Sequence, residues 1–248
     1  MEYIHDKIIT DKVNSWTDLI FVFIILITLL LIIIYKSNKS NTINYSKIYL
    51  INLENRKDRL NKFNETFYNS DISLKYNHFK AIDGKKINID KYVTSDTLRE
   101  INEIEETGNR KYHYQLTRGA IGCYLSHTNI WKDIINSNID SALIFEDDII
   151  IPNNLNYLLN DNIKYIPDDY DIILLGCNSL DCVKYKKYRK VNRFWLMHAY
   201  IITKKCILKI YDRMFPIKQQ IDSELSDLSD IINIYALNKN IVNQYLNK

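Results

Sequence analysis

The most extended apolar stretch of the chain covers residues 19–35, where Thr28 is the only interruption. A helix of this length would span about 25 Å, slightly less than the ~30 Å hydrocarbon core of a bilayer. A buried helix of a soluble domain would instead show polar positions every few residues. The pattern therefore predicts a single transmembrane helix at residues 19–35.

The segments on either side of this run are polar. Residues 1–18 form a tail of mixed charge, and residues 36–46 form a stalk rich in Ser, Asn and Lys. No small-residue cleavage site follows the apolar run, so we expect a retained single-pass anchor rather than a signal peptide. Lys7 and Lys12 precede the run, whereas Lys36, Lys39 and Lys47 follow it. This excess of one charge leans toward a cytoplasmic catalytic domain, but it leaves the side of the membrane open.

Residues 47–248 alternate between short apolar runs and longer amphipathic stretches. The runs predict strands at 47–53, 78–86, 141–145, 170–176, 193–203 and 231–237, and the stretches predict helices at 54–67, 116–136, 152–166 and 204–211. Thr117 is the expected N-cap of the second helix, and the charge-rich residues 87–111 are expected to be a surface excursion. Such alternation indicates an α/β domain with a mostly parallel central sheet.

An acidic triplet, Glu146-Asp147-Asp148, directly follows the apolar strand at 141–145. Three carboxylates at the end of a buried strand repel one another and lose hydration unless a cation compensates them. Hard oxygen ligands suit Mg²⁺ or Mn²⁺, and ligands bind outside the carboxyl ends of strands in α/β sheets. The triplet predicts a metal site that holds a diphosphate, and the alternative is an exposed acidic turn.

A second polar cluster lies in the turn after the first strand and contains Asn52, Arg56 and Arg59. The two arginines could neutralise a diphosphate as bidentate donors, with Arg56 favoured over Arg59, and the alternative is an ion pair with Asp58 or Glu54. The turn lacks a glycine-rich fingerprint, which excludes a P-loop and a Rossmann turn.

Charge and cysteine content limit the partners and metal sites that we expect for this chain. The net charge is +3 with acids and bases interspersed, so we expect no nucleic-acid partner. The basic cluster at 184–190 is interpreted as a solvated loop or sheet edge, with contact to an acidic acceptor or to lipid headgroups as the alternative. The four cysteines show neither a CxxC pair nor a zinc spacing.

Four blocks taken in order resemble glycosyltransferase family 25. The blocks are Ile48–Leu53 with Arg56, Asp58 and Arg59; Ala81–Lys85; Gly119–His127 with Trp131 and Ala142–Asp148; and Ala199–Ile202 with Pro216, Ile217, Asp222, Ile234–Ala236 and Gln244. The resemblance extends from Lys47 to the C-terminus, and the third block is its most specific part. It makes residues 47–248 a candidate catalytic domain.

The resemblance implies a GT-A-like nucleotide-sugar-binding fold, a UDP-sugar donor, Mn²⁺ or Mg²⁺ as cofactor, and inversion at the anomeric carbon. Asp148 is then the expected direct metal ligand, with Glu146 as the other candidate ligand, and Glu146 or Asp147 is expected to act through water or on the donor sugar. Asp222 is the candidate base on the acceptor hydroxyl, and its alternative is a helix N-cap. Family members often carry an acidic residue after Pro-Ile, where this chain has Lys218.

The remaining residues expected to bind the donor come from the same blocks. Asn52 would read the uracil or ribose, and Asp83, Gly122 and Ser126 belong to the donor side. His127 is expected either to hydrogen-bond the donor or to position the acidic triplet, and its alternative is a satisfied core histidine.

The predicted function is a membrane-anchored, metal-dependent glycosyltransferase that moves a hexose, with galactose favoured, from a UDP-sugar to a hydroxyl. The expected acceptors are a glycan or lipooligosaccharide, or hydroxylysine in a collagen-like chain. One alternative is an inactive, membrane-tethered binding or adhesion module. Another is a nucleotide-sugar hydrolase or phosphotransferase that uses the same site without an acceptor base.

Overall fold

The computed structural model describes residues 16, 17, 19–32, 45–112 and 114–245, and it divides into two compact units, 1–41 and 42–248. In the first unit the described residues are helical and exposed. Within the described residues, no helix has the length and apolar character needed to cross a bilayer. Residues 33–35 of the predicted anchor, and most of the predicted tail and stalk, lie outside the described part.

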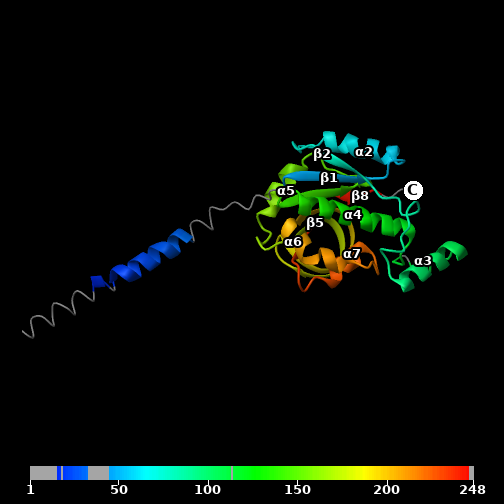
Figure 1. Cartoon of the computed structure of the whole chain (residues 1–248). Coiled ribbons are helices and arrows are strands. Elements are labelled where there is room, and N and C mark those ends of the chain that lie inside the picture. Colours follow the sequence, from blue (N-terminus) through cyan, green and yellow to red (C-terminus); the bar gives the residue numbers. More distant parts are fainter. Residues whose placement is uncertain (1–15, 18, 33–44, 113, 246–248) are drawn as a thin grey trace, which may run out of the picture. The chain divides into compact units, whose positions relative to one another are not determined.

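The second unit is a mixed α/β domain (Figure 1). In chain order it contains β1 (Lys47–Asn52), α2 (Lys57–Tyr68), β2 (Tyr76–Lys80), α3 (Ser95–Thr107), α4 (Arg118–Asn136), β3 (Ser141–Glu146), β4 (Ile149–Ile150), α5 (Leu155–Ile163), β5 (Ile172–Lys184), β6 (Tyr188–Thr203), α6 (Lys204–Ile210), η1 (Tyr211–Met214), α7 (Ile221–Asp227), β7 (Ile234–Leu237) and β8 (Asn243–Gln244).

The central sheet has the strand order β2-β1-β3-β6-β5-β7. β1 is parallel to β2 and β3, and β5 is parallel to β7, whereas β6 is antiparallel to both β3 and β5. β6 therefore runs opposite to the other strands of this sheet, which confirms the predicted mostly parallel α/β arrangement. β4 and β8 form a separate small antiparallel pair.

Both faces of the sheet are buried at β1, β3 and β7, which explains why these strands are nearly continuous apolar runs. In β1, Ile48 and Leu50 point to one core and Tyr49 and Ile51 to the other, as the period of two in a strand requires. α2 and α5 cover the first face, and α4 and α6 cover the second (Figure 1). The result is a three-layer domain whose strand ends remain accessible.

The expectation of a surface excursion at 87–111 is wrong. Residues 95–107 form α3, and Ile89, Val93 and Ile101 are buried in the core that contains α4. The Thr94 side chain accepts a hydrogen bond from the Thr97 backbone N–H, and Gly108 ends the helix at a φ of 68°. These cap residues, Thr and Gly, were the sequence signals of a helix here, and the abundant charge obscured them.

The strands predicted at 170–176 and 193–203 are parts of a longer hairpin. β5 continues to Lys184, β6 starts at Tyr188, and the two strands pair along most of their length with several bulges. The basic cluster at 184–190 is therefore the tip of this hairpin together with the first residues of β6. The start of β6 also pairs with β7, so the hairpin curls back over the end of the sheet.

Two glycines fix the approach of the loop at 81–86 to α4. A Cβ at Gly122 would overlap the Ile82 carbonyl oxygen, and a Cβ at Gly84 would overlap the Arg118 carbonyl oxygen. The Ser126 hydroxyl accepts a hydrogen bond from the Ile82 N–H (2.8 Å) and donates one to the Gly122 carbonyl (2.7 Å). The loop is thereby held directly against the first turns of the helix.

Replacing Gly122 by Ala is expected to lower the free energy of unfolding by about 1–3 kcal/mol, because the new methyl group must displace backbone atoms. Gly119→Ala is the matched control in the same helix, since a Cβ there would meet only Thr117 Oγ1, at 3.7 Å. Urea unfolding of both variants checks the prediction. Equal free energies of unfolding for the two variants would show that the loop at 81–86 can move away from α4 without a measurable cost.

Candidate active site

The candidate site lies at the carboxyl ends of β1 and β3. These neighbouring strands mark the point where the strand order changes direction, since β2 lies on one side of β1 and β3 on the other. Ligands of α/β sheets bind in such a crevice. A pocket of about 150 Å³ opens here. It is lined by Ile51, Leu53, Arg59, Ala81, Ile82, Gly119, Cys123, Ser126, Glu146 and Asp147.

Asp147 connects the two strand ends. Its carboxylate accepts hydrogen bonds from Asn52 Nδ2 (2.7 Å) and from Arg59 Nη1 (2.9 Å). Asn52 is fully buried; its Nδ2 also donates to the Arg56 carbonyl oxygen, and its Oδ1 pairs with His78 Nε2. The Asn52 amide is therefore engaged within the protein, where it orients Asp147.

Arg59 is the cation of the acidic triplet. Its Nη1 also lies 3.3 Å from Asp148 Oδ2, and its Nε is buried without a hydrogen-bond partner. Arg56, which was expected to share this role, forms a bidentate pair with Asp58 on the surface of the domain. One arginine thus serves two carboxylates and retains a free donor.

The negative charge of Asp148 is only partly compensated by Arg59. Burial and the neighbouring carboxylates of Glu146 and Asp147 raise its pKa above the ordinary value of an aspartate. Its Oδ1 accepts a hydrogen bond from Gln244 Nε2 (3.0 Å), and its carbonyl oxygen accepts one from the Tyr245 N–H. A cation beside this carboxylate would relieve the repulsion that raises its pKa.

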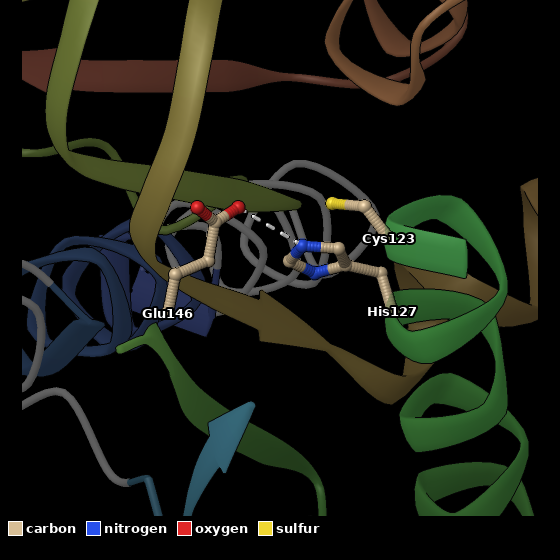
Figure 2. A group of neighbouring side chains, drawn as sticks. All are labelled: Cys123, His127 and Glu146. Atoms are coloured by element: carbon tan, nitrogen blue, oxygen red, sulfur yellow. Dashed lines mark hydrogen bonds and ion pairs between the residues drawn. The ribbon is translucent and has the colours of Figure 1, made fainter. Parts of the chain in front are cut away.

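Glu146 is oriented by a chain of buried side chains. His127 Nε2 lies 3.2 Å from Glu146 Oε1, and His127 Nδ1 lies 2.9 Å from the Tyr200 hydroxyl. The same hydroxyl accepts a hydrogen bond from Trp131 Nε1 at 3.0 Å. Figure 2 shows His127, one turn after Cys123 on α4, pointing toward Glu146 at the end of β3.

For a neutral His127 ring, the donors and acceptors of this chain can be assigned in order. Indole is only a donor, so the Tyr200 hydroxyl accepts from Trp131 and has its own proton to give. That proton goes to His127 Nδ1, which leaves Nε2 as the N–H that donates to Glu146. Burial would raise the pKa of Glu146, but the His127 hydrogen bond and nearby positive charge, including that of Arg59, together outweigh burial and hold the pKa below its usual value.

Cys123, His127 and Glu146 are, within the described residues, the one group of possible metal ligands whose atoms all lie within 4.8 Å of one another. Both nitrogens of His127 are already engaged, and burial raises the pKa of the Cys123 thiol well above its usual value. This trio is therefore poorly prepared to ligate a metal. The oxygen ligands of the triplet suit a hard cation better, although Asp148 lies outside the group.

Asp222 lies within the first turn of α7, and Gln220 occupies the N-cap, so its interpretation as the cap residue is wrong. Its carboxylate accepts hydrogen bonds from the Leu196 N–H (2.9 Å) and the Ser223 N–H (2.8 Å). Leu196 has a φ of 70°, a left-handed conformation that costs a leucine about 1–3 kcal/mol. Burial raises the pKa of Asp222, and the Glu146 charge adds to the effect.

The other residues expected on the donor side form the support of the pocket. Gly122 and Ser126 hold the loop at 81–86 against α4, and Asp83 Oδ1 accepts a hydrogen bond from the Lys85 N–H in that loop. Tyr200 and Leu196 were missed as site residues, because a tyrosine and a leucine inside an apolar strand carry no distinguishing signal in the sequence.

A known protein family and several known proteins resemble parts of this chain. A family model described as glycosyltransferase family 25 (LPS biosynthesis protein) matches residues 45–225. Procollagen galactosyltransferase 2 from Homo sapiens is 33% identical over 137 residues, which cover 53% of this chain and 21% of that protein. A glycosyltransferase 25 family member from Drosophila pseudoobscura pseudoobscura is 36% identical over 115 residues, which cover 46% of this chain and 17% of that protein.

The match thus spans about a fifth of the length of these curated relatives. Among solved structures, A197 from STIV aligns over 82% of this chain and 87% of that chain with a TM-score of 0.42 and 8% identity. That likeness is too weak to support an argument.

Proposed function

Because the chain belongs to glycosyltransferase family 25, we propose that it transfers a hexose from a UDP-sugar to an acceptor hydroxyl, with inversion and with the help of a divalent cation. One observation carries the proposal. At the carboxyl ends of β1 and β3, three carboxylates gather beside a pocket at the switch point of the sheet, and Arg59 pairs with two of them, Asp147 and Asp148. Galactose is the favoured sugar, since relatives are named galactosyltransferases.

The donor side is built from the acidic triplet and Arg59. Asp148 and Glu146 would hold Mn²⁺ or Mg²⁺, whose positive charge stabilises a diphosphate as it leaves. The unpartnered Nε of Arg59 gives the same site a free donor for a phosphate oxygen. The hydrogen bond from Asn52 to Asp147 holds the ends of β1 and β3 together beside the pocket.

The acceptor side is built around Asp222. An inverting transfer needs a base that removes the proton from the acceptor hydroxyl. Two backbone N–H groups orient the Asp222 carboxylate, and its raised pKa makes it a stronger base than an exposed aspartate. The strained backbone at Leu196 supports the assignment, because such strain concentrates at functional sites.

Two other functions use the same residues differently. Lys218 after Pro-Ile favours an inactive binding module, whereas the acidic triplet and its arginine, both present here, favour an enzyme. A hydrolase would need the donor site but not Asp222.

A panel of UDP-sugars, tested with Mn²⁺, Mg²⁺ or EDTA, tests the proposal by UDP release. Release from no sugar, with or without a collagen-like peptide or lipooligosaccharide, would contradict it.

Attachment to a membrane through residues 19–35 is part of the proposal. The large apolar side chains of residues 19–32 are exposed in the first unit, which favours a location within lipid. Sedimentation of the expressed full chain with membranes after alkaline carbonate washing is the expected result. Release into the supernatant would contradict attachment.

Replacing Tyr200 by Phe is expected to lower kcat by about tenfold, with a smaller effect on the KM for the donor. Without the tyrosine proton, His127 Nδ1 loses its partner and the ring no longer presents a fixed N–H to Glu146. Tyr157→Phe, which alters an exposed tyrosine, is the control. The altered His127 ring would weaken its hydrogen bond to Glu146, so the pH profile of kcat should also shift. A lower stability with unchanged kinetics would contradict the prediction.

A further inference from the structure

A second pocket, of about 490 Å³, lies at the carboxyl ends of β5 and β7. β5 and β7 run in the same direction as β1 and β3, so this pocket and the acidic triplet lie along the same edge of the sheet. Its cations are Lys184, Arg189 and Lys239, its amides include Asn238, Asn240 and Asn243, and no carboxylate residue lines it. The volume is in the range of pockets that bind small molecules.

We infer that this pocket is an acceptor subsite that recognises an acidic group, a carboxylate or a phosphate, on the acceptor glycan. The inference deepens the proposed transferase function and rests on it. It also assigns a role to the basic cluster at the tip of the β5–β6 hairpin, from which Lys184 and Arg189 come.

Arg189 is a cation of this pocket whose guanidinium is positioned by hydrogen bonds. Its Nη1 donates to the Asn238 carbonyl oxygen (3.1 Å), and its Nη2 contacts Asn240 Oδ1 (3.3 Å) and Cys177 Sγ (3.6 Å). These partners are uncharged, and its Nε is buried with no partner. A guanidinium that is fixed in place, has no carboxylate partner among the described residues and retains a buried donor is prepared for an anion.

Lys184 and Lys239 extend the positive charge across the pocket. In the part of the chain that the structure describes, neither ammonium group lies within ion-pair distance of a carboxylate. Three cations without a lining carboxylate produce a positive potential that attracts an acidic ligand. A neutral sugar could contact the same amides but would form no ionic interaction with these three cations.

The pocket is linked to the candidate active site by a short segment. Asn243 lines the pocket and pairs with Ile150 of β4, which follows the acidic triplet. The next residue, Gln244, donates to Asp148, and the Val242 carbonyl oxygen contacts His198 Nε2. A sugar held in this pocket would therefore contact the same segment that orients Asp148, as expected for an acceptor subsite.

Ligand-observed NMR on the full chain, with UDP and Mg²⁺ present, tests the inference with three probes: glucuronic acid, glucose 6-phosphate and glucose. We expect at least one acidic sugar to bind about tenfold more tightly than glucose. The two acidic probes separate a carboxylate from a phosphate. Combined replacement of Lys184 and Lys239 by Gln should weaken acidic-sugar binding by about five- to tenfold, and added salt should weaken it further.

Lys205→Gln on α6 is the matched control, because Lys205 lies outside the pocket and has no ion pair in the described structure. UDP binding to the same samples reports separately on the donor site. Equal binding of glucose and both acidic sugars, or acidic-sugar binding that the double variant leaves unchanged, would overturn the subsite. Absence of UDP binding would instead contradict the proposed transferase.

Discussion

Replacing Asp148 by Asn is expected to lower metal-dependent sugar transfer by about a thousandfold, because a neutral amide is a much weaker ligand for a hard cation. Asn retains the shape of the side chain and an oxygen for the hydrogen bond from Gln244. The loss should therefore come from metal binding rather than from misfolding. Titration of activity with Mn²⁺ measures it, with Asp161→Asn as the control.

Asp161 is a suitable control because its carboxylate forms an exposed ion pair with Lys164 and is not among the residues that line the candidate pocket. Such surface pairs contribute little to stability. Thermal unfolding provides a second readout. The cation should raise the melting temperature of the wild-type protein but not that of Asp148→Asn. In EDTA the variant should be at least as stable as the wild type, because like-charge repulsion around Asp148 is removed.

An Asp148→Asn protein that retains both the activity and the metal-induced stabilisation would show that the cation binds elsewhere. The trio of Cys123, His127 and Glu146 would then be the next site to test, since its ligand atoms are already close together.

The second large effect is expected at Asp222. Asp222→Asn should lower transfer to the acceptor by about 10²–10⁴-fold, because the amide cannot take a proton from the attacking hydroxyl. UDP binding and slow hydrolysis of the donor should survive, since Asp222 is not among the residues that line the donor pocket. Separate measurement of sugar transfer and UDP release distinguishes these outcomes.

The pH profile adds an independent test of the same role. Burial raises the pKa of Asp222, so transfer should fall with decreasing pH through a pKa above the ordinary aspartate value of about 3.9. That acidic limb should be absent from the residual activity of Asp222→Asn. Asp227→Asn, in the same helix and exposed, should keep it. Full transfer activity in Asp222→Asn would exclude Asp222 as the base.

The central fold could be predicted from the sequence because both faces of the sheet are buried. Strands such as Lys47–Asn52 and Ser141–Glu146 appear as unbroken apolar runs between polar turns. α4 was predicted with its cap at Thr117, which the structure confirms. α3 was missed because its sparse apolar positions are separated by many charges, and only its cap residues mark it.

The candidate site was predictable only in part. The Glu146-Asp147-Asp148 triplet stands out because carboxylates seldom follow a buried strand. The sequence favoured Arg56 over Arg59, but the start of α2 at Lys57 turns Arg59 toward the triplet and leaves Arg56 paired with Asp58. The contacts of Tyr200 with His127 and of Leu196 with Asp222 join distant segments, and only the folded chain brings them together.

The central claim is that the acidic triplet, with Arg59, forms a cation-dependent site for a nucleoside diphosphate. Calorimetric titration of UDP into the full chain, with Mn²⁺ and then with EDTA, tests it most directly. We expect UDP to bind in the presence of Mn²⁺, and we expect this binding to disappear in EDTA and in the Asp148→Asn variant. Equal binding in EDTA, or no binding under either condition, would contradict it.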